Sequence, residues 1–404
     1  MVQPTLDSLY SWARLGVAML IGTVGSVGMW SVVVVLPLVQ ADFGVARADA
    51  SLPFTLAMVG FALGNVVMGR MADRFGIVFP ILCGGLSLGV GYVGAALAPN
   101  LWLFAAAHAL LGLGAATSFG PLIADTSHWF LRRRGIAVAL CASGNYLGGT
   151  IWPFIVQHFS TTAGWRPTHI GIGLFCVAAI LPLAQALRRR PNLQEAAPLA
   201  AGLLAPGRRG DLGLTPNALT ALLFIAGIAC CVAMSMPQVH IVAYCGDLGY
   251  GVARGAEMLS LMMGFGIISR VGSGFIADRF GGLATLMLGS VLQSIALGLY
   301  LSFDGLTSLY VISALFGLFQ GGIVPSYAII VREYFSPQEA GTRVGIVIMG
   351  TVVGMAFGGW VTGLIFDLTG SYRVAFAHGI AWNLLNISIA LWLLLRSGRR
   401  LAVA

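Results

Sequence analysis

One arginine of this sequence lies where a charge is costly. Arg270 stands inside an apolar run, about 13 Å of helix before the polar end of that run at Arg279. A charge near mid-membrane costs about 2.5–3.5 kcal/mol on insertion scales, which favours a functional role. Glu257, an acid of the same run, lies about 20 Å away and on another helix face. We therefore expect a guanidinium that grips an arriving anion, with Gly266 and Gly274 leaving room beside it.

Other polar residues reach a similar depth in other apolar runs. Asn145 and Tyr146 follow a triplet of arginines by about 15–18 Å of helix, and Gln320 precedes Arg332 by about 18 Å. We expect these three side chains to bind the same ligand, and hydrogen bonds between helices are the alternative. His108 has a side chain that can carry protons near neutral pH, and a hydrogen-bonded packing role is its alternative.

Two short segments carry the same acid–base pair. Asp73-Arg74 and Asp278-Arg279 each stand between apolar runs, with glycine on both sides. A carboxylate there can pair with an arginine or cap a neighbouring helix N-terminus. We expect these four residues to gate a conformational change. A static turn that only marks orientation is the alternative, and the recurrence of the pair disfavours it.

The elements that position these residues must be membrane-spanning helices. The 404 residues are 58% hydrophobic and 9% charged, whereas a soluble domain carries about 25% charged residues. Runs of about 20 apolar residues, the length that crosses a bilayer, recur along the chain. The predicted fold is all-α, with twelve spans at 15–38, 50–69, 77–98, 101–124, 135–158, 167–187, 217–244, 254–276, 281–302, 306–331, 342–366 and 373–395.

Arginines set the orientation of these spans. All 22 basic residues are arginine, and with the N-terminus in the cytoplasm the outer loops hold Arg47, Arg166, Arg254 and Arg373. Arg270 lies within a span and the other 17 face the cytoplasm. This bias follows the positive-inside rule, so the net charge of +8 marks topology and not a nucleic-acid partner. Both termini are predicted to be cytoplasmic.

The chain repeats itself. The segment Gly69–Gly76 recurs as Gly274–Gly281, 205 residues later, and Gly112 and Gly317 keep the same offset. We predict an N-terminal six-helix bundle at 1–187, a cytoplasmic linker at 188–215 and a C-terminal six-helix bundle at 216–404. Related halves around one site are the geometry of alternating access in transporters.

The duplicated Asp-Arg segments resemble the signature loop of the major facilitator superfamily. The resemblance covers the whole chain and implies two pseudo-symmetric bundles, with spans 1, 4, 7 and 10 lining a central cavity. The segment from Trp129 to Gly144, an aromatic pair, a basic triplet and an Ala-Ser-Gly end, is similar to the span-five signature of the monocarboxylate transporters. Arg270 matches the span-eight arginine that binds substrate carboxylate in that family and in the oxalate/formate exchangers.

The sequence also departs from these families. The superfamily loop often ends in basic residues where this chain has Ile77-Val78, and the family aspartate one turn before the span-eight arginine is Gly266 here. The chain has no lysine, so it has no equivalent of the span-one lysine of the animal members or the span-eleven lysine of the oxalate exchangers, which argues against a dicarboxylate that needs two cations.

These features predict a secondary active transporter of a small organic anion, a monocarboxylate first, with proton symport as the leading mode. Anion exchange and a neutral or aromatic substrate are the alternatives, as is a sensor or scaffold that kept the fold. No catalytic cluster, metal-ligand set or phosphate loop points to an enzyme, a metal or a cofactor. The predicted partners are the acid, protons and lipid. We predict a monomer that spans a bacterial inner membrane several times.

Overall fold

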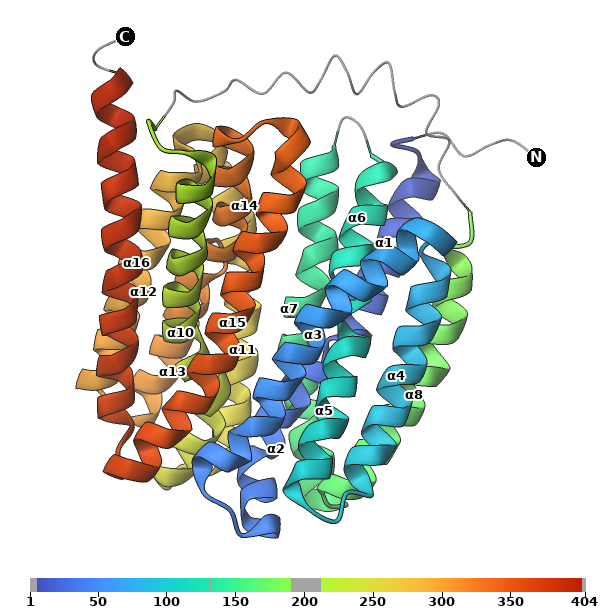
Figure 1. Ribbon diagram of the computed structural model, residues 1–404. Helices are drawn as coiled ribbons and strands as arrows, with labels where there is room; N and C mark the ends of the chain where they lie inside the picture. Colours follow the sequence, from blue (N-terminus) through green and yellow to red (C-terminus); the bar gives the residue numbers. More distant parts are fainter. Residues whose placement is uncertain (1–5, 131–132, 190–211, 402–404) are drawn as a thin grey trace. The chain divides into compact units, whose positions relative to one another are not determined.

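The computed structural model describes residues 6–130, 133–189 and 212–401, and these are helical without a strand among them. The chain divides into two units, Met1–Val45 with Leu52–Ala205 and Ala46–Ser51 with Pro206–Ala404. Their helices run from blue to green and from yellow-green to red in Figure 1. The predicted linker at 188–215 falls largely outside the described residues, and the predicted bundle boundaries remain predictions.

The first unit contains eight helices in the described residues. They are α1 (Leu9–Gly25), α2 (Val27–Phe43), α3 (Arg47–Phe75), α4 (Val78–Ala96), α5 (Leu101–Ala116), α6 (Gly120–His128), α7 (Arg134–Thr162) and α8 (Trp165–Ala186). The first turn of α3, up to Ser51, groups with the second unit.

The second unit contains seven helices in the part that is described. They are α10 (Pro216–Asp247), α11 (Val252–Phe280), α12 (Gly282–Ser302), α13 (Leu306–Gln320), α14 (Ile323–Tyr334), α15 (Pro337–Thr369) and α16 (Tyr372–Leu401). Figure 1 shows α16 running beside α10 and α12, and the residue contacts of α16 with each of these helices agree.

The apolar runs do form membrane-length helices. Within the described residues, eleven segments are long and apolar enough to cross a bilayer, and α7, 29 residues long, occupies the place of the fifth predicted span. Three spans differ from the single helices expected from the sequence. The first is broken at Ser26, the fourth between α5 and α6, and the tenth between α13 and α14.

The breaks in the fourth and tenth spans have local causes. In the fourth, the Thr117 and Ser118 hydroxyls donate to the carbonyls of Gly114 and Ala115, at 2.8 and 2.6 Å, and Pro121 follows without an N–H. In the tenth, two glycines, 321 and 322, separate the helices. Because both halves break at matching places, the interruption belongs to the repeated architecture.

Glycines bring the helices of each unit into backbone contact. A Cβ on Gly60 of α3 would overlap the Ala109 carbonyl of α5, and one on Gly112 of α5 would overlap the Ala57 carbonyl of α3. In the second unit, Gly317 of α13 meets Met262 of α11 in the same way. Close backbone approach is how helices associate in lipid, where apolar side chains gain nothing by leaving the solvent.

Candidate functional site

Arg270 lies in the second half of α11 and is half-buried. Of its two predicted small neighbours, Gly274 has open space where a side chain would stand, whereas the Gly266 carbonyl packs against Gly321. The Gly266 carbonyl is therefore a packing contact, and the room expected for a ligand beside Gly266 stays a prediction. Glu257 binds Arg254 at 3.0 Å and also accepts a hydrogen bond from Tyr310. This acid is thus engaged elsewhere, as its spacing from Arg270 predicted.

Gln320 ends α13 and is completely buried. Its Oε1 accepts a 2.7 Å hydrogen bond from Gln238 of α10, while its Nε2 has no hydrogen-bond partner among the described residues. An unsatisfied buried donor costs about 1–3 kcal/mol. The amide therefore retains an N–H that suits a carboxylate, and its place in the unit's core means that a ligand must open the packing to reach it.

Asn145 and Tyr146 are adjacent on α7, and both are partly exposed. The Asn145 amide donates to the Met29 sulfur of α2 at 3.7 Å, a weak interaction that leaves the amide oxygen available. Thr150, one turn later, bonds back to the Tyr146 carbonyl at 2.8 Å. The structure thus places the two predicted ligands on one short stretch of helix.

The Asp-Arg segments belong to helix ends and not to loops. Asp73 and Arg74 lie in the last turn of α3, and Asp278 and Arg279 lie in the last turn of α11, all of them exposed. The helices stop at the following glycines, whose φ angles of 84° and 88° belong to the left-handed region that favours glycine. Both arginines are well placed at helix C-termini, where the helix dipole favours a cation.

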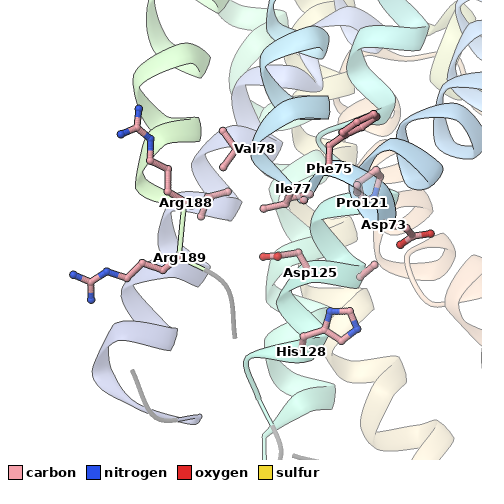
Figure 2. Close-up of a pocket in the computed structure, with 13 residues that line it drawn as sticks. Asp73, Phe75, Ile77, Val78, Pro121, Asp125, His128, Arg188 and Arg189 are labelled. Carbon is pink, nitrogen blue, oxygen red and sulfur yellow. The ribbon is translucent and has the colours of Figure 1, made fainter. Parts of the chain in front are cut away.

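A pocket of about 500 Å³ adjoins the first of these segments. Figure 2 shows its lining, with Asp73 and Asp125 on different sides and the Arg188 and Arg189 head groups pointing outward. The Asp125 carboxylate forms an ion pair with Arg14 of α1 at 2.8 Å. The Arg14 side chain is only 4% exposed. A cation from the first helix thus holds this carboxylate beside the non-basic Ile77-Val78 segment.

The corresponding corner of the second unit is built differently. Glu333 of α14 accepts hydrogen bonds from the Gly282 N–H at 3.1 and 3.2 Å, which caps the start of α12. The residues 205 positions before Glu333 and Gly282 are His128 and Ile77, and both line the pocket. The pocket therefore occupies the place where the other unit has a capping carboxylate.

Sequence reasoning missed a polar network in the second unit. The Arg47 guanidinium donates to both Asp247 oxygens, at 2.9 and 3.2 Å, and to the Tyr372 hydroxyl at 2.6 Å. Asp367 accepts from the backbone N–H groups of Arg47 and Ala48 at 2.9 and 2.7 Å, which caps the first turn of α3. From the sequence, Arg47 was interpreted only as an outer-loop charge. Asp247 and Asp367, acids near the outer ends of other helices, were the signal that could have indicated a network around it.

His108 is completely buried in α5 and faces a second histidine that sequence reasoning also missed. The ring of His169, on α8, lies 6.1 Å from the ring of His108 between centroids. Each ring bonds through Nδ1 to the carbonyl four residues earlier in its own helix, at 2.8 and 2.9 Å. The predicted proton carrier therefore belongs to a pair.

Comparison with known proteins places these features in a family. Residues 18–306 and 268–403 match the family model of the Major Facilitator Superfamily. Monocarboxylate transporter 13 of Bos taurus is 26% identical over 350 residues, which cover 84% of this chain and 79% of that protein. An MFS-type transporter of Gibberella moniliformis is 27% identical over 328 residues, which cover 80% and 76%.

The fold has solved counterparts. A crystal structure of a bacterial homolog to the human lysosomal transporter Spinster, in an inward-facing and occupied conformation, matches with a TM-score of 0.71. The match covers 97% of this chain and 96% of that one at 14% sequence identity, so it speaks for the fold alone.

Proposed function

We propose that this chain, which belongs to the Major Facilitator Superfamily, moves a small monocarboxylate across the membrane by alternating access, together with a proton. Membership of the superfamily makes it a multi-pass membrane transporter. The nature of the substrate rests on Arg270. A planar guanidinium can grip a carboxylate through two parallel N–H donors, which an ammonium cannot do.

The repeat supplies the observation that carries this assignment. The residue 205 positions before Arg270 is Asn65, at the same place in α3. Asn65 accepts a hydrogen bond from the Gly120 N–H at 3.2 Å and donates to the Phe61 carbonyl at 2.8 Å, so it supports the start of α6. The fold therefore accepts a neutral, structural amide at this position. A charged guanidinium in the other half is costly in lipid and calls for a function.

The remaining predicted residues have supporting roles in this proposal. Asn145, Tyr146 and the Nε2 of Gln320 supply neutral hydrogen bonds to the acid. Asp73 and Asp278, with Arg74 and Arg279 beside them, bias the conformations between which the protein alternates. His108 takes part in proton coupling.

The proposal includes a plasma-membrane location with both termini in the cytoplasm. The arginine distribution supports it, because 17 of 22 arginines fall on the side assigned to the cytoplasm. A relative from Bos taurus and another from Gibberella moniliformis show that similar chains also occur in eukaryotes. Monomeric function is part of the same proposal.

Uptake into proteoliposomes tests the mode of transport. We expect an inward proton gradient, without ATP, to drive accumulation of the correct acid, identified beforehand by thermal-shift screening of organic acids. Accumulation that needs a second acid inside the vesicles and ignores the proton gradient would establish exchange. Flux that responds to no gradient would refute secondary active transport.

Binding to Arg270 variants tests the substrate class. Truncating one side of a buried charge-assisted pair costs about 2–5 kcal/mol, so Arg270→Ala should weaken binding of the acid by roughly 30-fold to several thousand-fold. Arg270→Lys keeps the charge and loses the planar fork, and should also bind less tightly.

The matched control is Arg254→Lys, the same change in the first turn of the same helix at a side chain that is 53% exposed. Calorimetric titration should give this variant the affinity of the parent. If Arg270→Ala binds the acid as tightly as the parent does, a neutral substrate becomes the better hypothesis.

A further inference from the structure

The first turn of α3 is attached to the second unit. The chain passes from one unit to the other inside this helix, because the segment Ala46–Ser51 groups with the second unit and Leu52 with the first. Helix α3 begins at Arg47, so this segment, called the clasp below, contains its first turn. Hydrogen bonds from α10, α15 and α16 hold the clasp.

The start of the clasp depends on a carboxylate from another helix. The first N–H groups of a helix have no partner within it, and residues 44–46, which precede Arg47, carry no side-chain acceptor. Asp367 of α15 supplies one oxygen to the Arg47 N–H at 2.9 Å and the other to the Ala48 N–H at 2.7 Å. The helix dipole also favours a carboxylate at this end. The second unit therefore stabilises the first turn of a helix that continues into the first unit.

The Arg47 side chain completes the attachment. Its guanidinium binds both oxygens of Asp247, in the two-pronged geometry that makes arginine–carboxylate pairs strong. It also donates to the Tyr372 hydroxyl and lies 4.6 Å from the centre of the Phe366 ring. The Arg47 side chain is 8% exposed and the Asp247 side chain 36%. Because the acid remains in contact with water, this pair can be separated at a smaller cost than a fully buried one.

The clasp meets α15 backbone to backbone, and a proline follows it. A Cβ on Gly363 of α15 would lie 2.9 Å from the Ala48 Cα and from the Arg47 carbonyl oxygen. Two residues after the clasp, Pro53 has no N–H, so the helix lacks the hydrogen bond to the Asp49 carbonyl. Helices bend most readily at proline. The clasp is thus followed by a point at which α3 can change direction.

The repeat shows that the fold does not need a charged side chain at this place. The residue 205 positions after Arg47 is Val252, the first residue of α11. The residue 205 positions before Asp247 is Asp42, and it pairs with Arg166 at 2.9 Å within the first unit. Both of these side chains are exposed, and such surface pairs contribute little to stability.

Asp247 does not pair with the corresponding arginine of its own unit. Arg166 is the second residue of α8, and Arg373 is the second residue of α16. Arg373 lies 4.0 Å from Asp304, and both of these side chains are mostly exposed. In place of a surface pair of this kind, Asp247 binds a buried arginine on the helix that connects the units. This acid is therefore placed to control whether α3 stays attached.

We propose that the clasp is a releasable attachment. It is closed in the conformation described, and it opens when the protein opens toward the face that the arginine distribution assigns to the outside. On release, the Arg47 side chain leaves Asp247 and Tyr372, its backbone leaves Asp367, water hydrates the freed groups, and α3 bends at Pro53. This inference rests on the alternating access of the proposed function, and it does not depend on which substrate is carried.

Labelling of a buried cysteine tests release. Ser51→Cys places a thiol of nearly the same size at a buried clasp position, after the six native cysteines have been replaced by alanine. Ser290→Cys, completely buried in α12, reports general loosening. In lipid nanodiscs without substrate, a water-soluble maleimide should label Ser51→Cys about tenfold faster than Ser290→Cys or more, because local opening exposes only the clasp. Equal protection of the two thiols would mean that the clasp does not open, and the proposal would be wrong.

Variants of the clasp test what holds it closed. Asp367→Asn should speed the labelling of Ser51→Cys by about a further tenfold, because an amide holds N–H groups less strongly than a carboxylate does. Arg47→Gln should act in the same direction, and neither change should affect Ser290→Cys. The matched control is Asp42→Asn, which removes the acid of an exposed pair in the first unit and should leave both rates unchanged. If Asp367→Asn speeds both thiols alike, this acid only stabilises the fold and the clasp is refuted.

A covalent link tests whether release belongs to the transport cycle. Arg47→Cys combined with Asp247→Cys, joined by a flexible bismaleimide, replaces the ion pair with a connection that cannot open. Uptake of radiolabelled lactate into proteoliposomes should then stop, whereas the same link between Arg166→Cys and Asp42→Cys should leave uptake intact. Uptake by the linked clasp at the rate of the unlinked variant would refute release and leave the proposed transport standing. If the unlinked protein takes up no lactate, the proposed function fails for this acid, and the labelling rates still decide the clasp.

Discussion

The contact between α3 and α5 allows a sharp prediction for Gly112→Ala. A Cβ at position 112 would overlap the Ala57 carbonyl oxygen and lie 2.7 Å from its carbon and 2.9 Å from the Ala57 Cα. All three are backbone atoms, so no side chain can rotate away. Gly60 faces the Ala109 backbone in the same manner, so α3 and α5 are in backbone contact at two places. A tilt that relieved the clash at one place would have to disturb the contact at the other.

Overpacking of a tight interior costs about 1–3 kcal/mol, and occasionally more, and a backbone-to-backbone clash should fall at the upper end. We expect a loss of about 3 kcal/mol for Gly112→Ala, or about 3–4 °C in Tm if the whole chain melts together. The measurement is the thermal melting of detergent-purified protein followed by intrinsic fluorescence. Gly317→Ala should lose a similar amount, because its Cβ would lie 2.8 Å from the Met262 carbonyl carbon.

Gly16→Ala in α1 is the control, because no atom lies within 4 Å of the position that the alanine methyl group would occupy. It should melt with the parent or slightly above, since alanine favours a helix over glycine by about 0.5–1 kcal/mol. If Gly112→Ala melts together with Gly16→Ala, the close approach of α3 and α5 is not as described.

Two further predictions concern charged residues. Asp125→Asn leaves the Arg14 charge buried and unpaired and should cost about 3–5 kcal/mol in thermal melting, whereas the double change Arg14→Met with Asp125→Leu should recover most of it. A double variant as unstable as the single one would contradict this. Asp73→Asn and Asp278→Asn should shift the balance between inward-open and outward-open states, measured by labelling of cysteines placed at both faces. Unchanged labelling with unchanged turnover would reduce these acids to orientation signals.

Much of the fold could be predicted because lipid allows few alternatives. A backbone that crosses a bilayer must satisfy its polar groups within a helix, so apolar runs of sufficient length identify the spans. The helix breaks at Ser26 and after Ala116 could not be predicted in this way. They depend on hydroxyls that bond to their own backbone, as Thr117 and Ser118 do, and hydropathy does not register such bonds.

Depth along a helix singled out Arg270 and Gln320 as candidates, because a fixed rise per residue converts position into height, and their roles stay predictions. It could not identify partners, which depend on how helices are rotated against one another. Gln238 beside Gln320 and His169 beside His108 come from other spans. The contact of the Gly266 carbonyl with Gly321 likewise joins two spans.

The repeat helps to separate residues that the fold needs from residues that function needs. Where the two halves agree, as at Gly112 and Gly317, the shared feature is a backbone contact that either half loses only at a cost in stability. Where they differ, one half has a neutral and satisfied side chain and the other has a group that is costly to bury. Asn65 corresponds to Arg270 in this way, and Ser313 corresponds to His108.

These two differences fall in opposite halves. The anion anchor that we propose lies in the second, and His108, which we propose for proton coupling, lies in the first. Duplication supplies the same helix positions twice, so each half can keep its packing while only one carries each charge. Removal of the buried imidazole should then leave the affinity for the acid measurable. For that reason His108→Gln should still bind the acid in calorimetric titration, whereas Arg270→Ala should not bind it tightly.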